Sequence, residues 1–191
     1  NRVFKRIELA AAVSRADVII SLPKLKTHGQ MDFTGALKNQ YGLVVGAVKA
    51  LYHFRLKSRD WLAELIVDIN RTAKPALAIM DGIVAMEGAG PSGGDPRPMN
   101  VLVAGADLAA VDVVSCHLIG LEALRTPIAR AARSQRFGAT SLEEIEVVGA
   151  DWESLRQPDF KKVANPEDIL GLVPLPKAIL NWVCRHLAPR P

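Results

Sequence analysis

The stretch ADVIISLPKLKTHGQMDFTGALKNQYG, residues 16–42, joins a strand pattern to the residue types best suited to chemistry. Its first part, Asp17 to Ser21, is a compact β-branched run that ends at Pro23. Such a run is typical of a strand. Because it is apolar on both faces, it predicts a buried strand in a parallel sheet that helices cover.

Three further runs have the same strand character, and helical patterns separate them. We expect strands at 76–80 (ended by Asp81-Gly82), 101–104 and 145–148. We expect helices at 7–15, 60–70, 108–121 and 127–137, with Trp61 on the apolar stripe of the second and Asp107 capping the third. Strands that alternate with helices predict an α/β fold, with a largely parallel sheet flanked by helices.

Two stretches interrupt this alternation. Residues 85–98, AMEGAGPSGGDPRP, are rich in glycine and proline and predict an irregular loop. From Gln157 onward prolines recur to the end of the chain, apart from an amphipathic piece at 177–187. We therefore expect an α/β domain over 1–156 and a proline-punctuated wrap or linker over 157–191.

Composition excludes several classes of function. Apolar residues make up 49% of the chain, which is enough for a sizeable core, yet no apolar run is long enough to span a membrane. No signal peptide is visible at the start, so we expect a cytoplasmic protein. The net charge of +4 fits a small anionic partner, whereas an aromatic content of 5% argues against nucleic acid. Cys116 and Cys184 have no neighbours at metal-ligand spacing, and we expect two reduced thiols with Cys116 buried.

Positive charge gathers between Pro23 and His53, directly after the first strand. Ligands of α/β proteins bind at the carboxyl ends of strands, and lysines there favour a phosphate or a carboxylate. A helix that opens at Thr34-Gly35 would add backbone amides for the same anion. The predicted cofactor-binding residues are Lys24, Lys26, Thr34, Gly35, Lys38 and Asn39, with Lys49 adding charge. The alternative for each lysine is a solvated surface position.

Two histidines of the same segment, His28 and His53, are the predicted catalytic residues, because imidazole exchanges protons near neutral pH. His53 is also the predicted metal ligand. Both could instead be structural or exposed histidines.

Three acidic residues are expected to support the site or form its lid: Asp81, Glu87 and Asp112. Asp81 could instead be a turn former, and Glu87 could belong to a flexible surface loop. Asp112 lies in an apolar helical run, AAVDVV, where a buried carboxylate needs a partner such as a cationic group or a loop to cap.

Three blocks of the chain resemble the domain of unknown function 362 family: residues 16–46, 79–94 and 101–121, in the expected order. In that family the domain is often joined to a ferredoxin-like module that binds [4Fe-4S] clusters. The resemblance implies such a module after the terminal HLAPRP and a further α/β segment before residue 1. The chain is thus expected to be a fragment of a larger protein.

A second similarity is to the lactate racemase family, in which a histidine, a lysine and a second histidine follow a strand. His28, Lys38 and His53 occur in that order, 10 and 15 residues apart. The resemblance implies a catalytic role for His28, attachment of a nickel-pincer nucleotide to Lys38 and nickel binding by His53. The turn differs, because TGALKN stands where that family has a GG-x-K sequence.

Three functions follow as expectations. The family resemblance implies an iron–sulfur-linked oxidoreductase or electron-transfer component, in which residues 23–53 hold an anionic substrate or cofactor and an electron-transfer partner acts on it. The alternatives are a racemase-like enzyme with a metal or nucleotide cofactor, and a non-enzymatic anion-binding or scaffold domain.

Overall fold

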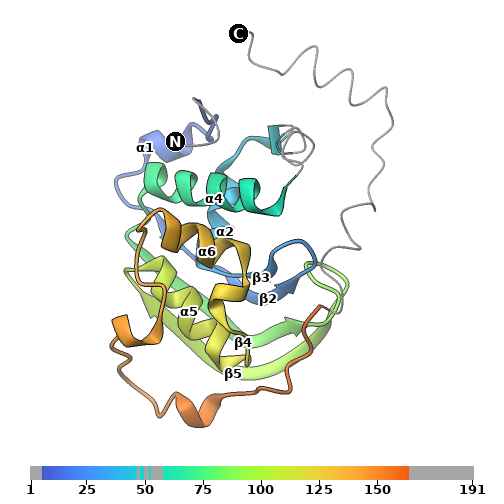
Figure 1. The fold of residues 1–191 in the computed structure, drawn as a ribbon. Helices are drawn as coiled ribbons and strands as arrows, with labels where there is room; N and C mark the ends of the chain where they lie inside the picture. The colour runs from blue at the N-terminus through green and yellow to red at the C-terminus, as the bar shows by residue number, and fades with distance from the viewer. Residues whose placement is uncertain (1–5, 47, 50–51, 53–57, 164–191) are drawn as a thin grey trace.

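The residues that the structure describes form a five-stranded sheet with helices packed against it (Figure 1). The structure, a computed structural model, describes residues 6–46, 48–49, 52 and 58–163. Its strands are β1 (Ile20–Ser21), β2 (Lys24–His28), β3 (Asp32–Thr34), β4 (Leu77–Glu87) and β5 (Asp95–Gly105).

The long strand β4 organises the sheet. β5 pairs antiparallel with it over almost its whole length, so β1 and β2 must share its other edge, where both run parallel to it. β1 and β2 therefore follow each other end to end, interrupted at Leu22-Pro23, and β3 extends the sheet antiparallel to β2. The predicted α/β fold, with parallel central strands flanked by helices, is confirmed.

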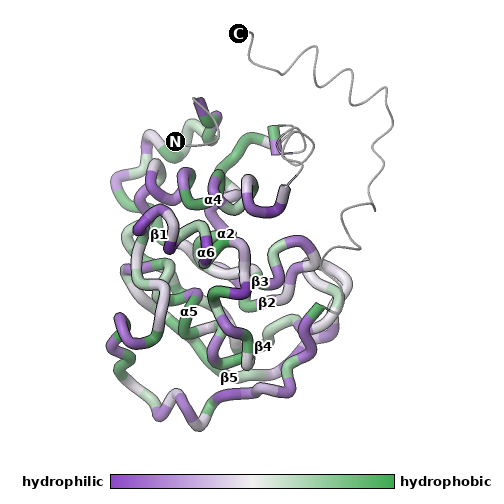
Figure 2. The backbone as a smooth tube through the Cα atoms, viewed as in Figure 1, coloured by the Kyte–Doolittle hydropathy of each residue, from purple (hydrophilic) through white to green (hydrophobic). Residues whose placement is uncertain are grey.

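The helices are α1 (Ala12–Arg15), α2 (Ala36–Asn39), α4 (Arg59–Ala73), α5 (Leu108–Leu118) and α6 (Pro127–Ser134). Short 3-10 turns add η1 (Gln40–Leu43), η2 (Ala123–Arg125), η3 (Leu142–Glu144) and η4 (Glu153–Leu155). Helix α5 packs on β4 and β5 and is the most apolar of the described helices, as the green tube beside its label in Figure 2 shows. Helix α2 packs on α5 and α4, which places it inside the helical layer.

The helix predictions hold in part. Asp107 caps α5 as expected, its Oδ1 accepting from the backbone N–H groups of Ala109 and Ala110 at 2.8 and 3.2 Å. The helix expected at 7–15 covers only α1. Trp61 of α4 is 59% exposed, so the prediction that it belongs to the buried stripe is wrong. It lies at the margin of the helix face whose residues Leu62, Leu65 and Ile66 are buried.

One face of the sheet is open around β1. Val18 and Ile20 are 62% and 54% exposed, and Leu22 is more exposed still, so the prediction of a strand buried on both sides is wrong. Only Ser21 of β1 is buried. The helices cover the face toward which β4 directs Ala78 and Met80, and no described element packs over Ile20 and Leu22.

The glycine- and proline-rich stretch is a regular hairpin, which corrects the expected loop over 85–98. β4 continues through Asp81-Gly82 with a register shift, instead of turning there, and pairs Met86 with Pro96. Residues 88–94 alone connect β4 to β5. Prolines fit β5 because it is an edge strand that pairs, within the described residues, only with β4.

The last described segment runs along β5 (orange in Figure 1). The strand expected at 145–148 is absent: these residues have no regular structure, and Val148 is 82% exposed. Further on, Phe160 is buried in the core and the Gln157 N–H donates to the carbonyl of Leu118. Residues 164–191, with Cys184 and most of the predicted linker, lie outside the described residues, whereas Cys116 is buried as expected.

Candidate functional site

A buried carboxylate fills the start of helix α2. The backbone N–H groups of Ala36 and Leu37 both donate to Asp112 of α5, the latter at 3.1 Å. The amides predicted to bind an external anion at Thr34-Gly35 are therefore already bonded to an acidic side chain of the protein itself. Asp112, which was expected to support the site, caps the helix that carries Lys38.

Gly35 is required by this cap. A Cβ on Gly35 would lie 2.1 Å from Asp112 Oδ1 and 2.3 Å from Phe33 Cε1, far inside contact distance. Gly35 thus has a packing role, because only hydrogen leaves room for the side chain of Asp112, and its ligand-binding role stays a prediction.

Two further polar contacts fix α2. Asn70, fully buried in α4, donates from Nδ2 to the carbonyl of Leu37 at 2.9 Å. Asn39 donates from Nδ2 to Ser21 Oγ of β1 at 3.0 Å, so its predicted cofactor-binding group is engaged within the fold. The sequence analysis missed Asn70, although a polar residue one turn after Ile66 on a buried helix face is the signal that marks it.

The ammonium group of Lys38 lies within the field of two others. Lys38 is partly buried at the end of α2, and no described residue forms an ion pair with it. Its own burial, followed by repulsion from Lys26 and Lys49, lowers the pKa of Lys38 to about 8. We call Lys26, Lys38 and Lys49 the lysine cluster.

The neighbours of the lysine cluster are polar. Lys26 Nζ donates to the carbonyl of Pro91 at 3.2 Å, which brings the tip of the β4–β5 hairpin against it. Thr34 is the register partner of Lys26 on β3, so the two side chains leave the same face of the strand pair. Thr34 Oγ1 is buried and has no hydrogen-bond partner among the described residues. Thr34 therefore lies beside Lys26, and its cofactor-binding role stays a prediction.

Lys24 belongs to a different group. Its Nζ pairs with Asp81 Oδ2 of β4, and both side chains are about two-fifths exposed. The bond to Lys24 and the N–H of Ile83 hold the pKa of Asp81 below its ordinary value. Asp81 Oδ1 accepts from the N–H of Ile83, two residues on, at 3.0 Å, as in an Asx turn, and Oδ2 is bonded to Lys24, so Asp81 is not a free carboxylate of the lysine cluster.

His28 closes the β2–β3 turn. Its Nδ1 accepts from the backbone N–H groups of Gln30 and Met31 at 3.0 and 3.2 Å. In the neutral ring the proton is then on Nε2, and Nδ1 is not available as a base. Arg59 of α4 holds the same turn through Asp32 Oδ2 at 2.6 Å. His53, the second predicted catalytic residue and the predicted metal ligand, lies outside the described residues.

Glu87, the third predicted acidic residue, ends β4 as a buried anchor. Its Oε2 accepts from the backbone N–H of Lys161 at 2.9 Å, and Lys161 Nζ lies 3.6 Å from its other oxygen. The carboxylate therefore ties the last described segment to the sheet.

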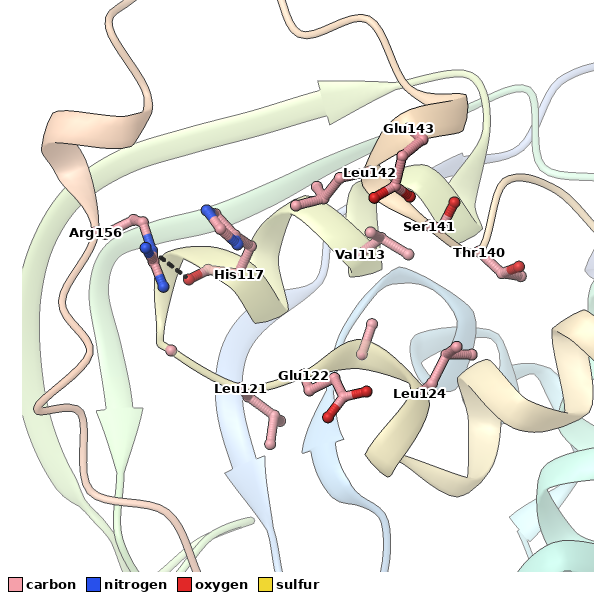
Figure 3. A pocket seen from close by; sticks show the side chains of 12 residues that line it. Val113, His117, Leu121, Glu122, Leu124, Thr140, Ser141, Leu142, Glu143 and Arg156 are labelled. Carbon is pink, nitrogen blue, oxygen red and sulfur yellow. Dashed lines mark hydrogen bonds between the residues drawn. The ribbon is translucent and has the colours of Figure 1, made fainter.

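A hollow of about 400 Å³ lies between the end of α5, η2 and η3 (Figure 3). None of the predicted site residues lines it. Its His117 lies 3.1 Å from the carboxylate of Glu153 and packs against Trp152, while Arg156 donates to the His117 carbonyl at 3.4 Å (the dashed line in Figure 3). These polar groups fasten the 152–156 segment to α5, so the chemistry we consider is that of the lysine cluster.

The described residues contain no group of three or more His, Cys, Asp or Glu side chains able to hold a metal ion. Among the same residues, no helix combines the length and the apolar character needed to cross a bilayer.

The fold and the site together define a class of protein: an α/β domain with a lysine cluster beside its sheet. Within that class the chain belongs to the family described as a domain of unknown function (DUF362), which matches residues 1–117. The chain is also 36% identical, over 141 residues, to a thylakoid-associated protein of Synechocystis sp.. The match covers 73% of this chain and 44% of that protein, so the chain spans less than half of this relative. No solved structure matches the chain.

The cap on α2 gives a first prediction. Gly35→Ala forces Asp112 or Phe33 to move, and we expect it to lower the free energy of unfolding by about 2 kcal/mol or more. Gly42→Ala is the matched control, because a Cβ there meets nothing within 4 Å, and it should change stability by less than about 0.5 kcal/mol. Denaturant melts measure both; equal stability of the two variants would contradict the packing role.

The protonation of Asp112 gives a second prediction. Burial raises the pKa of Asp112 to about 7, against the opposing effect of the two amides, so the folded state keeps a proton that the unfolded state has lost. Stability should therefore fall as the pH rises from about 4 to about 7, with a slope approaching 1.4 kcal/mol per pH unit from this one group. Asp112→Asn should remove that contribution from urea melts across this range. An unchanged slope in the variant would contradict the assignment.

Proposed function

We propose that the lysine cluster binds a small anionic ligand carrying a phosphate or carboxylate group. The observation that carries the proposal is Lys38, a partly buried cation without an acidic partner among the described residues and beside two other cations. Buried charges in proteins are normally paired, and like charges held together cost free energy. A bound anion would remove both costs.

The two outer lysines suit this role. Lys26 is held by the carbonyl of Pro91, and Lys49 follows η1 with its own carbonyl bonded to the hydroxyl of Tyr41 at 3.1 Å. Neither forms an ion pair with a described residue, so their charges are available to a ligand. The alternative is a basic surface without a ligand, which fits Lys38 less well because its burial costs stability.

We further propose that this domain is the ligand-holding part of an iron–sulfur-linked oxidoreductase, with the [4Fe-4S] clusters in a module outside this chain. The support is the family membership and the length of the relative, which exceeds the part matched here. The thylakoid association belongs to the relative, and a cytoplasmic location for this protein stays a prediction. The racemase-like alternative also stays a prediction, since it depends on His53.

Anion binding should weaken as Lys38 loses its proton. Sulfate and oxalate keep their charge between pH 7 and 9, whereas Lys38, with a pKa of about 8, becomes mostly neutral. We expect affinity to be highest below pH 8 and to fall severalfold, up to about tenfold, by pH 9. Isothermal titration calorimetry or NMR titration measures it.

Two variants test the assignment of that pH dependence. Lys38→Met should weaken binding about tenfold at pH 7 and abolish the dependence. Lys162→Met is the control, because Lys162 is exposed and bonds only to the carbonyl of Pro158 at 2.7 Å. Equal binding by wild type and Lys38→Met would exclude the lysine cluster as the site.

The redox proposal has its own test. The full-length natural protein, purified without oxygen, should contain iron and sulfide in equal proportion and show the visible absorption of [4Fe-4S] clusters. A colourless protein without iron would overturn the redox proposal and leave the anion site untouched.

A further inference from the structure

We propose that the amphipathic segment of this chain at residues 177–187 packs on the uncovered face of the sheet formed by β1, β4 and β5. We call this surface the open face. It shares no residue with the lysine cluster, so the proposal is independent of the anion site. Its apolar side chains are those of Val18, Ile20, Leu22, Leu77, Ile79, Leu102 and Ala104.

The register of the strands gathers these side chains on one side of the sheet. Ile20 pairs with Leu77 of β4, and Ile79 of β4 pairs with Ala104 of β5. Paired residues lie side by side, and successive residues of a strand point to opposite faces. Ala78, between the two residues of β4, is fully buried, so Leu77 and Ile79 belong to the other face. A continuous apolar surface therefore crosses three strands.

The open face exposes large apolar side chains to solvent. Val18, Leu22 and Leu102 are 62%, 69% and 61% exposed. A sheet face that stays in water normally carries polar residues, and a contiguous apolar patch marks an interaction surface. The ion pair of Lys24 with Asp81 forms the border of the patch at the end nearer the β4–β5 hairpin.

The strand directions indicate what kind of element covers the open face. β1 and β2 both run parallel to β4. Parallel strands are normally covered by helices on both faces of the sheet, whereas the described helices cover one. We therefore expect the cover to be a helix with one apolar side.

The sequence at 177–187, KAILNWVCRHL, has the pattern of such a helix. A helix of this length would be about 16 Å long, which matches the run of β4 from Leu77 to Asp81, about 13 Å. Its polar residues recur at every fourth position: Lys177, Asn181 and Arg185. Its apolar residues recur at the spacing of one helix side: Ile179, Leu180, Val183, Cys184 and Leu187.

The place where the last described segment is fixed allows this contact. The N–H of Lys161 donates to Glu87 Oε2 at 2.9 Å, and its carbonyl accepts from the N–H of Gly88 at 2.8 Å. The described chain thus ends beside the last residue of β4. From Glu87 back to Ile79, in the middle of the open face, the strand is about 26 Å long. Residues 164–176 can span at most about 45 Å, which is enough to reach it.

The tether favours this segment over a separate molecule. A segment joined to the fold by a short connection has an effective concentration on the order of millimolar at a surface within its reach. A second copy of the chain would have to bind at its much lower solution concentration. Contact between the segment and the open face would remove two apolar surfaces from water at once.

Cross-linking of Cys184 to the open face tests the proposal in the full chain of residues 1–191. Ile20→Cys and Leu102→Cys each place a thiol on the open face, and Cys116 is buried and stays out of the reaction. A short bismaleimide is added, and peptide mass spectrometry identifies the linked cysteines. We expect both variants to form the link to Cys184 within one chain, at least about tenfold above the control, because the two thiols stay within reach of each other.

Trp61→Cys is the matched control for accessibility. Trp61 is 59% exposed, between the 54% of Ile20 and the 61% of Leu102, but it lies on α4 in the helical layer. Random collisions of the segment with the surface would link Cys184 to all three introduced cysteines to a similar extent.

A charge on the apolar side of the segment should release it from the open face. In the Leu102→Cys chain, Val183→Asp should lower the yield of the link to Cys184 at least about fivefold, because a carboxylate facing an apolar surface is costly. Asn181→Asp adds the same charge on the polar side and should leave the yield unchanged. Circular dichroism checks that all variants fold.

Three results would each overturn the proposal. The first is a yield for Ile20→Cys and Leu102→Cys no higher than that for Trp61→Cys. The second is an equal yield with Val183→Asp and Asn181→Asp. The third is a set of links that join two chains, together with a dimer in light scattering, which would assign the open face to a second copy of the chain.

Discussion

A single acidic side chain, Asp112, joins helix α5 to the first turn of α2. It lies in the most apolar of the described helices and accepts from two backbone amides of α2, with Gly35 leaving the space it needs. Because the carboxylate is buried, it would be costly without these donors, and the donors would be costly without it. The position of α2, and with it that of Lys38, therefore depends on the hydrogen bonds between Asp112 and these two amides.

The same arrangement explains why positive charge is concentrated and not dispersed. The acidic residues predicted for the site all have other partners. Asp112 is bonded to the start of α2, and Asp81 is paired with Lys24. Glu87 is bonded to Lys161 in the last described segment. The lysine cluster is left without a carboxylate of its own among the described residues. Functional sites in proteins often retain such unfavourable local electrostatics, because binding or reaction relieves it.

Much of the fold could be predicted from periodicity, and the failures have physical causes. Asp107 and the α4 and α5 helices follow from local rules that do not depend on distant residues. The hairpin over 85–98 could not be predicted, because proline is tolerated only once β5 is known to be an edge strand. The exposure of Val18 and Ile20 likewise depends on which face of the sheet the helices cover. The apolar pattern of the strand does not predict which face that is.

The sequence by itself determined the α/β class, the family and the segment in which cationic residues gather, because strand and helix periods and local composition are properties of neighbouring residues. Only the tertiary structure decided which of these residues meet. It gave the amides after Gly35 to Asp112 and the Nδ1 of His28 to its own turn, and it put Lys38 within the fields of Lys26 and Lys49. Hydrogen bonds and charge interactions between residues far apart in the chain depend on distances that exist only after folding.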